Sequence, residues 1–424
     1  MKGLALLPHQ EREVAILRDH PRALLLSATG TGKTVTLLTR AREALAQGGR
    51  VLWLTNSSLQ AQLVAEAGKW LPPSLQPCQL LEAAWHEPFT YATHELAMKR
   101  VDHLQDRGPY SLLVVDEAAK VGGGGVDRTA KKYRAIRALS HAADSAILAT
   151  AEPLASVHAL DLWAIADVAG IPGLPDRETM NKWVQWQELR QSHRTKRVAV
   201  GISGPGFAAL LAAIRPFQVR TRLADVATLP DVETSHYPVR LSAEAASEYA
   251  AASQQPGLSG HHGRQAASRD ALALVPEAIR ILMDVFADRE SAVMFSDMFD
   301  LIEPLGEAMT AAGITYVRLD GQVKARGRAS ALAKHRAGEA RVLLMTSAGE
   351  AGVNAQHASL LVSVVQSYSP ARESQRVGRI RRLGSPHSSL VHAIVRPDVG
   401  HEQRRQQILT EKERLIEAMW QGLK

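Results

Sequence analysis

Short runs of apolar residues recur along the chain, and each is followed by a turn and then by polar or amphipathic sequence. In the first half the runs occupy residues 23–26, 51–54, 112–115 and 146–149. In the second half the same arrangement returns at residues 292–295, 314–318, 342–345, 360–365 and 390–395. Strands that are apolar throughout and alternate with helical sequence are typical of parallel sheets covered on both faces. The pattern therefore predicts an α/β protein with two parallel sheets.

The sequence between and after these two halves has a different character. Residues 154–289 are mostly helix-like with loops, and the proline-bounded stretch 229–238 indicates a connection between two domains. The last part, residues 401–420, is charged and has a helical period, so we expect it to pack on the second domain. We therefore place a first domain at residues 1–232 and a second domain at residues 233–424.

The most specific local signal follows the first apolar run, where residues 27–34 are Ser-Ala-Thr-Gly-Thr-Gly-Lys-Thr and a helix-compatible stretch begins. A strand, a glycine-rich loop and a helix in that order form a phosphate-binding P-loop. The glycines let backbone amides turn toward phosphate oxygens, the lysine adds a positive charge, and the last threonine hydroxyl can hold Mg²⁺. The predicted ligands are Ser27, Thr29, Gly30, Thr31, Gly32, Lys33 and Thr34, with Thr34 also a metal ligand. A chance glycine-rich turn is the alternative, since Ser27 stands where the general pattern has glycine.

Two carboxylates stand at the end of the third apolar run, where Asp116 and Glu117 follow two valines. Open α/β sheets bind ligands at the carboxyl ends of their strands. We predict that Asp116 holds Mg²⁺, mostly through water, and that Glu117 orients and deprotonates the attacking water. A capped strand end would explain the pair taken alone. Together with the P-loop upstream, the pair indicates a nucleotide-hydrolysing site, because one metal ion needs both.

Composition and charge narrow the class of protein. The 424 residues are 46% hydrophobic and 22% charged, which supplies enough apolar sequence for folded cores. The formal net charge of +7 favours an anionic partner. The single cysteine excludes an intramolecular disulfide, and no cysteine and histidine residues have zinc spacing. No stretch has the form of a membrane span or a secretory signal, so we expect a reducing cytosol.

Further motifs flank the two predicted sites in a fixed order. In the first half they are Leu-Pro-His-Gln at residues 7–10, residues 52–62, and Thr-Ala-Glu-Pro at residues 150–153. In the second half they are Phe-Ser-Asp at residues 295–297, Arg-Leu-Asp-Gly at residues 318–321 with Arg328, residues 346–354, and residues 375–384. Together they resemble the motifs of superfamily 2 helicases over nearly the whole chain. The resemblance implies two RecA-like lobes of the P-loop NTPase class, with ATP bound between them.

The middle of the chain resembles one particular group within superfamily 2. Residues 214–222, 224–226 and 229–230 are similar to the segment that precedes the second lobe in Swi/Snf-like double-stranded DNA translocases. Tyr-Ser-Pro at residues 368–370 stands where that family has Trp-Asn-Pro. This likeness implies helical protrusions from both lobes, at about residues 154–226 and 242–285.

The resemblance also assigns roles to single residues. Gln10 would recognise adenine, and Arg379 and Arg382 would reach the γ-phosphate as arginine fingers, although a solvated basic turn is the alternative for the arginines. Further nucleotide ligands from the second-half motifs would be Gly349, Gly352, Asn354 and Gln375. Ala119 replaces the final histidine of the DEAH-type box, and Glu152 replaces a threonine of the family pattern. We expect hydrolysis to survive both changes and its coupling to stepping to be affected.

Contacts to nucleic acid are expected at hydroxyl groups near helix N-termini, where such motors track phosphates. The candidates are Ser57, Ser58, Thr93, Thr346 and Ser347. A basic run either adds contacts or forms a solvated face; it consists of Arg128, Lys131, Lys132, Arg134 and Arg137. Trp183 and Trp186 could stack on bases, but their spacing favours the anchoring of a helix in its core. The sequence shows no base-reading module, so binding is expected to be independent of DNA sequence.

These observations predict an ATPase with Mg²⁺ as cofactor that hydrolyses ATP when bound to double-stranded DNA and moves along the duplex. A strand-separating DNA or RNA helicase of the same superfamily is the first alternative. A degenerate ATP-binding clamp on DNA is the second, because Ala119 and Glu152 depart from the family pattern. We expect a monomer in the absence of ligands, in a cytosol of bacterial or phage type, and the sequence indicates no particular protein partner.

Overall fold

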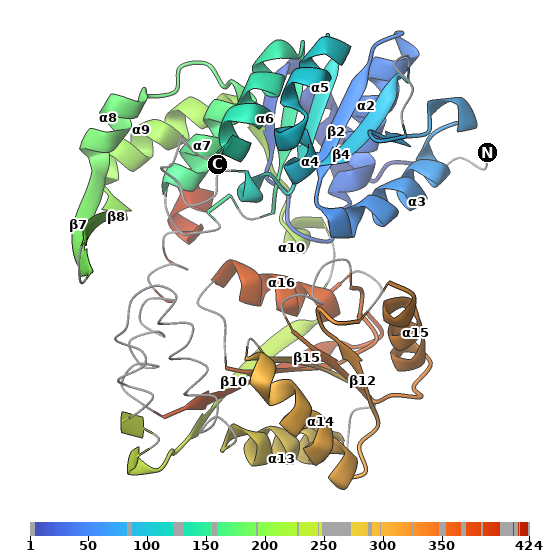
Figure 1. Cartoon of the computed structure of the whole chain (residues 1–424), viewed down its shortest axis with the longest axis vertical. Helices are drawn as coiled ribbons and strands as arrows, with labels where there is room; N and C mark the ends of the chain where they lie inside the picture. Colours follow the sequence, from blue (N-terminus) through green and yellow to red (C-terminus); the bar gives the residue numbers. More distant parts are fainter. Residues whose placement is uncertain are drawn as a thin grey trace. The chain divides into compact units, whose positions relative to one another are not determined.

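Two compact units make up the chain in a computed structural model. The structure describes residues 5–82, 87–121, 131–151, 153–154, 159–191, 194–226, 229–244, 246–247, 273–286, 291–296, 298–323, 325–346, 353–365, 370–382, 385–398, 410, 414 and 416–422. Unit 1 comprises Met1–Val226 and Arg414–Lys424, and unit 2 comprises Ala227–Glu413. Each unit holds one parallel sheet with helices on both faces, so the predicted α/β fold with two parallel-sheet lobes is confirmed (Figure 1).

The sheet of unit 1 has seven strands in the order β3-β4-β2-β5-β6-β1-β9. They are β1 (Arg22–Leu25), β2 (Val51–Thr55), β3 (Cys78–Gln79), β4 (Phe89–Thr93), β5 (Leu112–Asp116), β6 (Ala146–Ala149) and β9 (Gln218–Val219). The four strands predicted from apolar runs are neighbours at the centre of this sheet, β2-β5-β6-β1, and every pairing is parallel. The strands that the sequence did not predict, β3, β4 and β9, lie outside these four.

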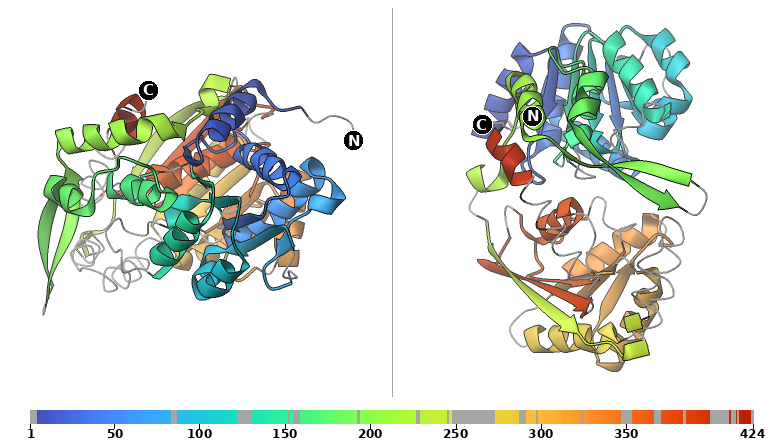
Figure 2. Two further views of the ribbon diagram at one scale, coloured as in Figure 1. Left: turned by 90° about the horizontal axis from the view of Figure 1, so that it is seen from above. Right: turned by 90° about the vertical axis from the view of Figure 1, so that its left-hand side faces the viewer.

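Helices cover both faces of this sheet (Figures 1 and 2). They are α1 (Pro8–Asp19), α2 (Lys33–Ala46), α3 (Gln60–Trp70), α4 (His94–Lys99), α5 (Val101–Arg107), α6 (Lys131–Ala142), α7 (Ala159–Ala169), α8 (Arg177–Trp183), α9 (Gly204–Ile214) and α10 (Leu223–Val226). Single 3-10 turns are η1 (Ser57–Leu59), η2 (Pro73–Leu75), η3 (Ala118–Lys120) and η4 (Arg215–Phe217).

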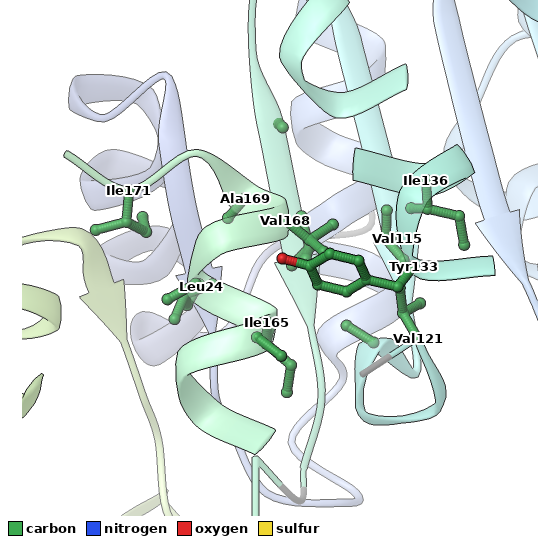
Figure 3. Packing of buried hydrophobic residues seen from close by; sticks show 14 of the residues in the cluster. Leu24, Val115, Val121, Tyr133, Ile136, Ile165, Val168, Ala169 and Ile171 are labelled. Carbon is green, nitrogen blue, oxygen red and sulfur yellow. The ribbon is translucent and has the colours of Figure 1, made fainter. Parts of the chain in front are cut away.

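Alternate residues of the central strands contribute to two separate cores in unit 1. Leu24 and Leu26 belong to the core that α6 and α7 cover, whereas Ala23 and Leu25 belong to the core on the α1, α2 and α3 side. In the first core the Tyr133 ring of α6 lies among residues from α7 and β5 (Figure 3). A strand with both faces buried must be apolar at every position, which is why these strands were readable in the sequence.

Unit 2 contains a six-stranded parallel sheet in the order β10-β15-β14-β11-β13-β12. Its strands are β10 (Asp231–Val239), β11 (Ala292–Ser296), β12 (Tyr316–Leu319), β13 (Val342–Met345), β14 (Leu360–Val364) and β15 (Ser389–Pro397). Its helices are α13 (Leu274–Phe286), α14 (Ile302–Ala311), α15 (Ala325–Arg336) and α16 (Pro370–Ile380), with the 3-10 turn η5 (Phe299–Leu301). Helices α13 and α14 share a core with one face of the sheet, and α15 and α16 line the other.

The stretch 229–238 is not only a connection, as predicted, because it contains most of β10. This strand pairs along its whole length with β15 and has no second neighbour among the described strands, so it is an edge strand of the described sheet. Its residues alternate between exposed and half-buried, which resembles loop sequence, and Pro238 is tolerated because an edge strand has one unpaired side.

The segment predicted to be a helical protrusion at residues 154–226 is only partly helical. It contains α7, α8 and α9, but an antiparallel hairpin of β7 (Val184–Gln191) and β8 (Arg194–Ile202) separates α8 from α9. Trp183 and Trp186 pack on the core of unit 1, as predicted, but Trp183 ends α8 and Trp186 lies in β7. Most of the second predicted protrusion, 242–285, lies outside the described residues. Where the structure describes the chain, none of its helices is both long and apolar enough to cross a membrane.

The end of the chain packs on unit 1, not on the second domain as predicted. Residues 416–422 are helical, and Met419 is fully buried in the same core as Leu210 and Leu211 of α9. The Arg220 Nη1 atom donates a hydrogen bond to the Trp420 carbonyl oxygen at 2.6 Å, and the guanidinium lies 4.8 Å from the centre of the Trp420 ring. Helical periodicity identified an apolar face but not the surface that it covers.

A buried histidine makes the stability of unit 2 dependent on pH. His335 of α15 is almost fully buried, with Nε2 3.0 Å from the Ala292 carbonyl oxygen and Nδ1 3.0 Å from Nε2 of His357. Burial and the neighbouring His357 ring lower the pKa of His335 to about 4. In the unfolded chain a histidine has a pKa of about 6.5. The unfolded state therefore binds the proton first as the pH falls.

We expect the free energy of unfolding of unit 2 to fall as the pH drops from about 6.5 to about 4, by up to about 3 kcal/mol from His335. Urea unfolding curves at a series of pH values measure this loss. The His335→Gln variant cannot take up the proton, so its stability should depend less on pH over the same range. An equal dependence in the variant and the parent would contradict the assignment.

Candidate nucleotide site

The loop between β1 and α2 has the backbone of a phosphate cradle. Gly30 and Gly32 have positive φ angles of 89° and 82°, which a residue with a side chain rarely adopts. Gly32 precedes the first residue of α2, and no side chain caps this helix end. The first amides of a helix attract anions through their hydrogen atoms and the helix dipole. The predicted P-loop residues therefore surround a helix N-terminus suited to phosphate.

Two side chains of the loop donate hydrogen bonds to one carbonyl oxygen. The Lys33 ammonium donates a hydrogen bond to the Ala28 carbonyl oxygen at 3.1 Å, and the Thr31 hydroxyl donates to the same oxygen at 2.9 Å. Thr29 and Thr34 are partly exposed, whereas Ser27 is fully buried. The hydroxyls of Thr29 and Thr34 are thus accessible to a ligand, and that of Ser27 is turned into the protein.

Residues of α1 hold the loop from its buried side. The Gln10 Nε2 atom donates to the Thr31 carbonyl oxygen at 3.2 Å, and Nε2 of His9 lies 2.8 Å from the same oxygen. A Cβ atom on Gly32 would lie 2.3 Å from the Gln10 amide, so this approach needs a glycine. The structure thus brings Gln10 to the phosphate loop, and its contact with adenine stays a prediction.

Glu13 is a residue of this site that the sequence analysis missed. Its carboxylate is fully buried and accepts a hydrogen bond from Ser27 at 2.5 Å and from Thr36 at 2.7 Å. Glu13 therefore joins the first residue of the loop to the first turn of α2. This contact gives a structural role to Ser27, which stands where the general P-loop pattern has glycine. The signal was present in the sequence, because Glu13 interrupts the buried stripe of α1, which includes Val14 and Leu17.

We expect the Glu13→Gln variant to lower the free energy of unfolding of unit 1 by about 1–3 kcal/mol, because hydrogen bonds to a buried charged group are worth that much. The KM for ATP should rise as well, since the loop loses its anchor on α1. Urea unfolding and ATPase kinetics measure the two effects. The Ser27→Ala variant removes only one of the two hydrogen bonds and should lose less stability. Unchanged stability and KM in the glutamine variant would refute this role.

The predicted acidic pair lies at the carboxyl end of β5, one strand removed from β1. Glu117 has a φ angle of 54°, a left-handed conformation that is costly for any residue other than glycine, and its amide donates to Asp116 Oδ1 at 3.0 Å. Burial and then the Glu117 carboxylate raise the pKa of Asp116 to about 7, whereas the Lys33 ammonium acts in the opposite direction. Two carboxylates and a lysine therefore interact at this edge of the sheet.

The unit 1 candidates for nucleic-acid contact follow neighbouring strands at the same edge. Ser57 and Ser58 begin the 3-10 turn after β2, and Ser57 is exposed. Thr93 ends β4, and its hydroxyl accepts a hydrogen bond from the Leu96 amide at the start of α4. The basic run is different, because Lys132 forms an ion pair with Glu95 at 2.7 Å and Arg137 with Asp167 at 2.9 Å. Arg128 lies outside the described residues.

The segment that suggested a Swi/Snf-like protein lies beside the phosphate loop. Backbone amides of Leu26 and Ala28 donate to the carbonyl oxygens of Val219 and Thr221, at 2.8 and 2.9 Å. A Cβ atom on Gly30 would lie 3.4 Å from the Leu223 side chain. Residues 218–223 thus form one wall of the loop.

In unit 2 the candidate residues gather near α16. Arg379 Nη1 donates to the Val353 carbonyl oxygen at 3.4 Å, and its own carbonyl accepts from the Ala355 amide, which places Arg379 beside Asn354. Burial and the neighbouring Arg379 charge lower the pKa of Arg382 to about 10, so the Arg382 guanidinium lies near that of Arg379 and is charged at neutral pH. Gln375 is partly exposed on the same helix.

The remaining unit 2 candidates are only partly described. Thr346 follows β13 and is nearly buried, with its amide donating to the Leu319 carbonyl oxygen at 3.3 Å. Ser347, Gly349 and Gly352 lie outside the described residues, and so does Glu152 of unit 1.

A separate pocket of about 640 Å³ lies at the opposite edge of the unit 1 sheet. It is lined among others by Arg18, Arg40, Glu43, Gly49, Ser111 and Asp144. The residues before β2, β5 and β6 border it, whereas the phosphate loop and the acidic pair follow the carboxyl ends of strands. Glu43 forms ion pairs with Arg18 at 2.6 Å and with Arg40, so these charged residues that line the pocket balance one another.

Comparison with known proteins places the unit 2 motifs in a family. Residues 277–384 match the helicase conserved C-terminal domain. The DNA repair protein RAD5B of Arabidopsis thaliana is 28% identical over 129 residues, which are 30% of this chain and 10% of that protein. The chromodomain-helicase-DNA-binding protein 1-like of Mus musculus is 29% identical over 126 residues, which are 29% of this chain and 14% of that protein.

A solved structure is similar over more of the chain. The Sulfolobus solfataricus SWI2/SNF2 ATPase core in complex with dsDNA shares 15% sequence identity with a TM-score of 0.45, covering 92% of this chain and 88% of that one. The matched part of this chain spans only 10% and 14% of the length of the two curated relatives named above. In its motif order and in the matched domain, the chain is similar to Swi/Snf-like members of the superfamily 2 helicases.

Proposed function

We propose that this protein is a DNA-dependent ATPase that uses ATP hydrolysis to move along double-stranded DNA. The observation that carries the proposal is the arrangement at the carboxyl edge of the unit 1 sheet. A glycine loop with two left-handed residues opens α2 beside an acidic pair, and Lys33 interacts with Asp116 of that pair. A phosphate cradle, a cation and a metal-binding carboxylate are the parts that nucleotide hydrolysis requires.

The loop would bind the phosphates of ATP. The amides of residues 29–34 would donate to phosphate oxygens, and Lys33 would exchange its hydrogen bond to Ala28 for one to the β- and γ-phosphates. Gln10 would contact the adenine base. Glu13 keeps the loop in place through Ser27, so the cradle is formed before the nucleotide arrives.

The residues present fit a Mg²⁺ ion. Burial and then the nearby Glu117 carboxylate raise the pKa of Asp116 to about 7, and a divalent cation would favour the charged form of the carboxyl group against both. Asp116 and Thr34 would hold the ion, which would neutralise charge on the β- and γ-phosphates. Glu117 would accept the proton of the attacking water, and its strained left-handed backbone is typical of residues at functional sites. Arg379 and Arg382 of unit 2 would stabilise charge on the γ-phosphate in the transition state.

DNA would be bound through its phosphates. Ser57, Ser58 and Thr93 follow neighbouring strands of unit 1, and Thr346 follows a strand of unit 2, so each unit offers hydroxyls and amides at strand ends. Two curated relatives are named as a DNA repair protein and a DNA-binding helicase, which supports DNA as the partner.

The test compares ATP turnover with duplex DNA, single-stranded DNA and RNA at equal nucleotide concentration. We expect the largest stimulation from duplex DNA, together with displacement of a third strand from a triplex and little unwinding of a forked duplex. Efficient fork unwinding without triplex displacement would favour the strand-separating helicase. DNA binding without any stimulation of turnover would favour the clamp.

A further inference from the structure

The β7–β8 hairpin is an element of unit 1 that the nucleotide site does not use. Its two strands form a sheet of their own and pair with no other described strand. In both views of Figure 2 and in Figure 1 the hairpin extends away from the helices and sheet of unit 1, joined to them only at the α8 and α9 end. An isolated two-stranded hairpin is marginally stable in water. A hairpin that projects in this way therefore needs a binding partner or strong contacts at its base to stay folded.

The root of the hairpin is firmly held. Val184 is buried, and Trp183, Trp186 and Ile202 pack on the core of unit 1. The Ser203 amide donates to the Trp183 carbonyl oxygen at 2.8 Å, and the Trp186 indole donates to the Asn181 carbonyl oxygen at 3.3 Å. A Cβ atom on Gly206 would lie 2.5 Å from the Trp183 ring, so α9 approaches α8 closely at this glycine. These contacts fix the direction in which the two strands leave unit 1.

Beyond the root, the sequence becomes strongly basic. Residues 188–197 contain Arg190, Arg194, Lys196 and Arg197 but only one acidic residue, Glu188. These ten residues contribute a net +3 to the +7 of the whole chain. The register places Glu188 opposite Arg197, whereas Arg190 stands opposite Thr195 and Lys196 opposite Leu189. In this backbone register, one of the four basic positions lies opposite an acidic position.

The other basic segment of unit 1 lies in α6. Lys132 and Arg137 of α6 are matched by Glu95 and Asp167, and their charge is already neutralised. Four cations on one short projection repel one another and favour a polyanion. The major groove of B-form DNA is wide enough for a two-stranded β-ribbon, and phosphates flank it on both sides. Residues 188–197 contain no aromatic residue that could separate base pairs, which favours a grip on intact duplex.

We propose that the β7–β8 hairpin is a second DNA-binding element, which holds duplex phosphates through Arg190, Arg194, Lys196 and Arg197 in addition to the strand-end contacts of the motor. This inference rests on the proposed function, because it presupposes that the chain binds DNA. Its consequence is a larger dependence of DNA affinity on salt than the strand-end contacts alone produce, since each neutralised phosphate releases counterions.

The experiment measures duplex DNA affinity at a series of salt concentrations for the parent protein and for a variant in which all four basic residues are replaced by glutamine. Each phosphate contact contributes about 0.9 to the slope of log affinity against log salt. The slope should therefore become shallower by about 3–4 in the variant. Thermal unfolding of both proteins confirms that the variant is folded, and a second variant with lysine at each arginine position should retain the parent slope.

A matched pair of variants tests whether the place of the charge matters. Lys196→Gln with Arg197→Gln removes two adjacent cations from the hairpin, and Lys99→Gln with Arg100→Gln removes the same two from the exposed end of α4. Only the hairpin variant should make the slope shallower, by about 2. An unchanged slope in the fourfold variant, or equal losses in the two double variants, would overturn the inference while leaving the proposed function intact. Absence of DNA binding by the parent protein would instead refute the proposed function.

Discussion

ATP turnover should fall to background in the Lys33→Ala variant, whether DNA is present or not. Lys33 begins α2 at the phosphate loop, where its ammonium already bonds to the loop and acts on Asp116. Without it, the phosphate loop loses the lysine charge that would balance the β- and γ-phosphates. A coupled assay that follows phosphate release measures the loss, and duplex binding at low salt should remain.

A lysine elsewhere on unit 1 provides the control. Lys69 of α3 is exposed and forms a surface ion pair with Glu66 at 2.9 Å, so Lys69→Ala changes the same residue type at little cost. The control should hydrolyse ATP as the parent does. Turnover near the parent value in Lys33→Ala would refute the assignment of residues 27–34 as a phosphate loop.

The Arg382→Ala variant should lower DNA-stimulated turnover by on the order of 10³-fold, the range found for arginine fingers. Burial beside Arg379 lowers the pKa of Arg382 only to about 10, so the guanidinium is charged at neutral pH. Such a charge acts mainly on the transition state, and the affinity for ATP should change much less than turnover. Arg379→Ala should have the same effect to a lesser degree. Steady-state kinetics at saturating ATP separate the two quantities.

The neighbouring residue is the matched control for this prediction. Arg381 donates a hydrogen bond from Nε to the Pro230 carbonyl oxygen at 2.9 Å, a contact within unit 2 that holds the start of β10. Arg381→Ala should therefore lower the stability of unit 2 and leave turnover close to that of the parent. A variant of Arg382 that binds ATP weakly but turns over normally at saturation would show that Arg382 is a binding residue and no arginine finger.

The central strands could be predicted from the sequence because burial on both faces leaves a continuous apolar signal. Residues 51–54 and 112–115 became β2 and β5 with nearly the expected bounds, and 292–295 and 342–345 became β11 and β13. The backbone of the loop at residues 27–34 could be predicted for another reason: left-handed positions favour glycine, and Gly30 and Gly32 occupy them. That this loop binds phosphate stays a prediction.

Elements with one exposed side gave no such signal. β10 alternates between exposed and half-buried residues and carries Pro238, so the stretch resembled a linker. The hairpin strands β7 and β8 pair only with each other among the described strands, and charged residues interrupt the apolar positions in their sequence. Glu13 was missed because a lone glutamate on a helix is usually solvated, and only the fold brings Ser27 and Thr36 to its carboxylate. Contacts between residues distant in sequence have no local pattern.

Because residues 416–422 pack on unit 1, unit 1 can be completed only after unit 2 has been synthesised. The ribosome makes all of unit 2, Ala227–Glu413, before it supplies the segment whose Met419 fills the core of unit 1. At about 5–20 residues per second, the nascent first unit waits roughly 10–40 s for that segment. During this interval the core that contains Leu210 and Leu211 of α9 lacks the Met419 side chain. A chaperone that binds exposed apolar surface would have its target there, and the target would disappear when the last helical turn docks.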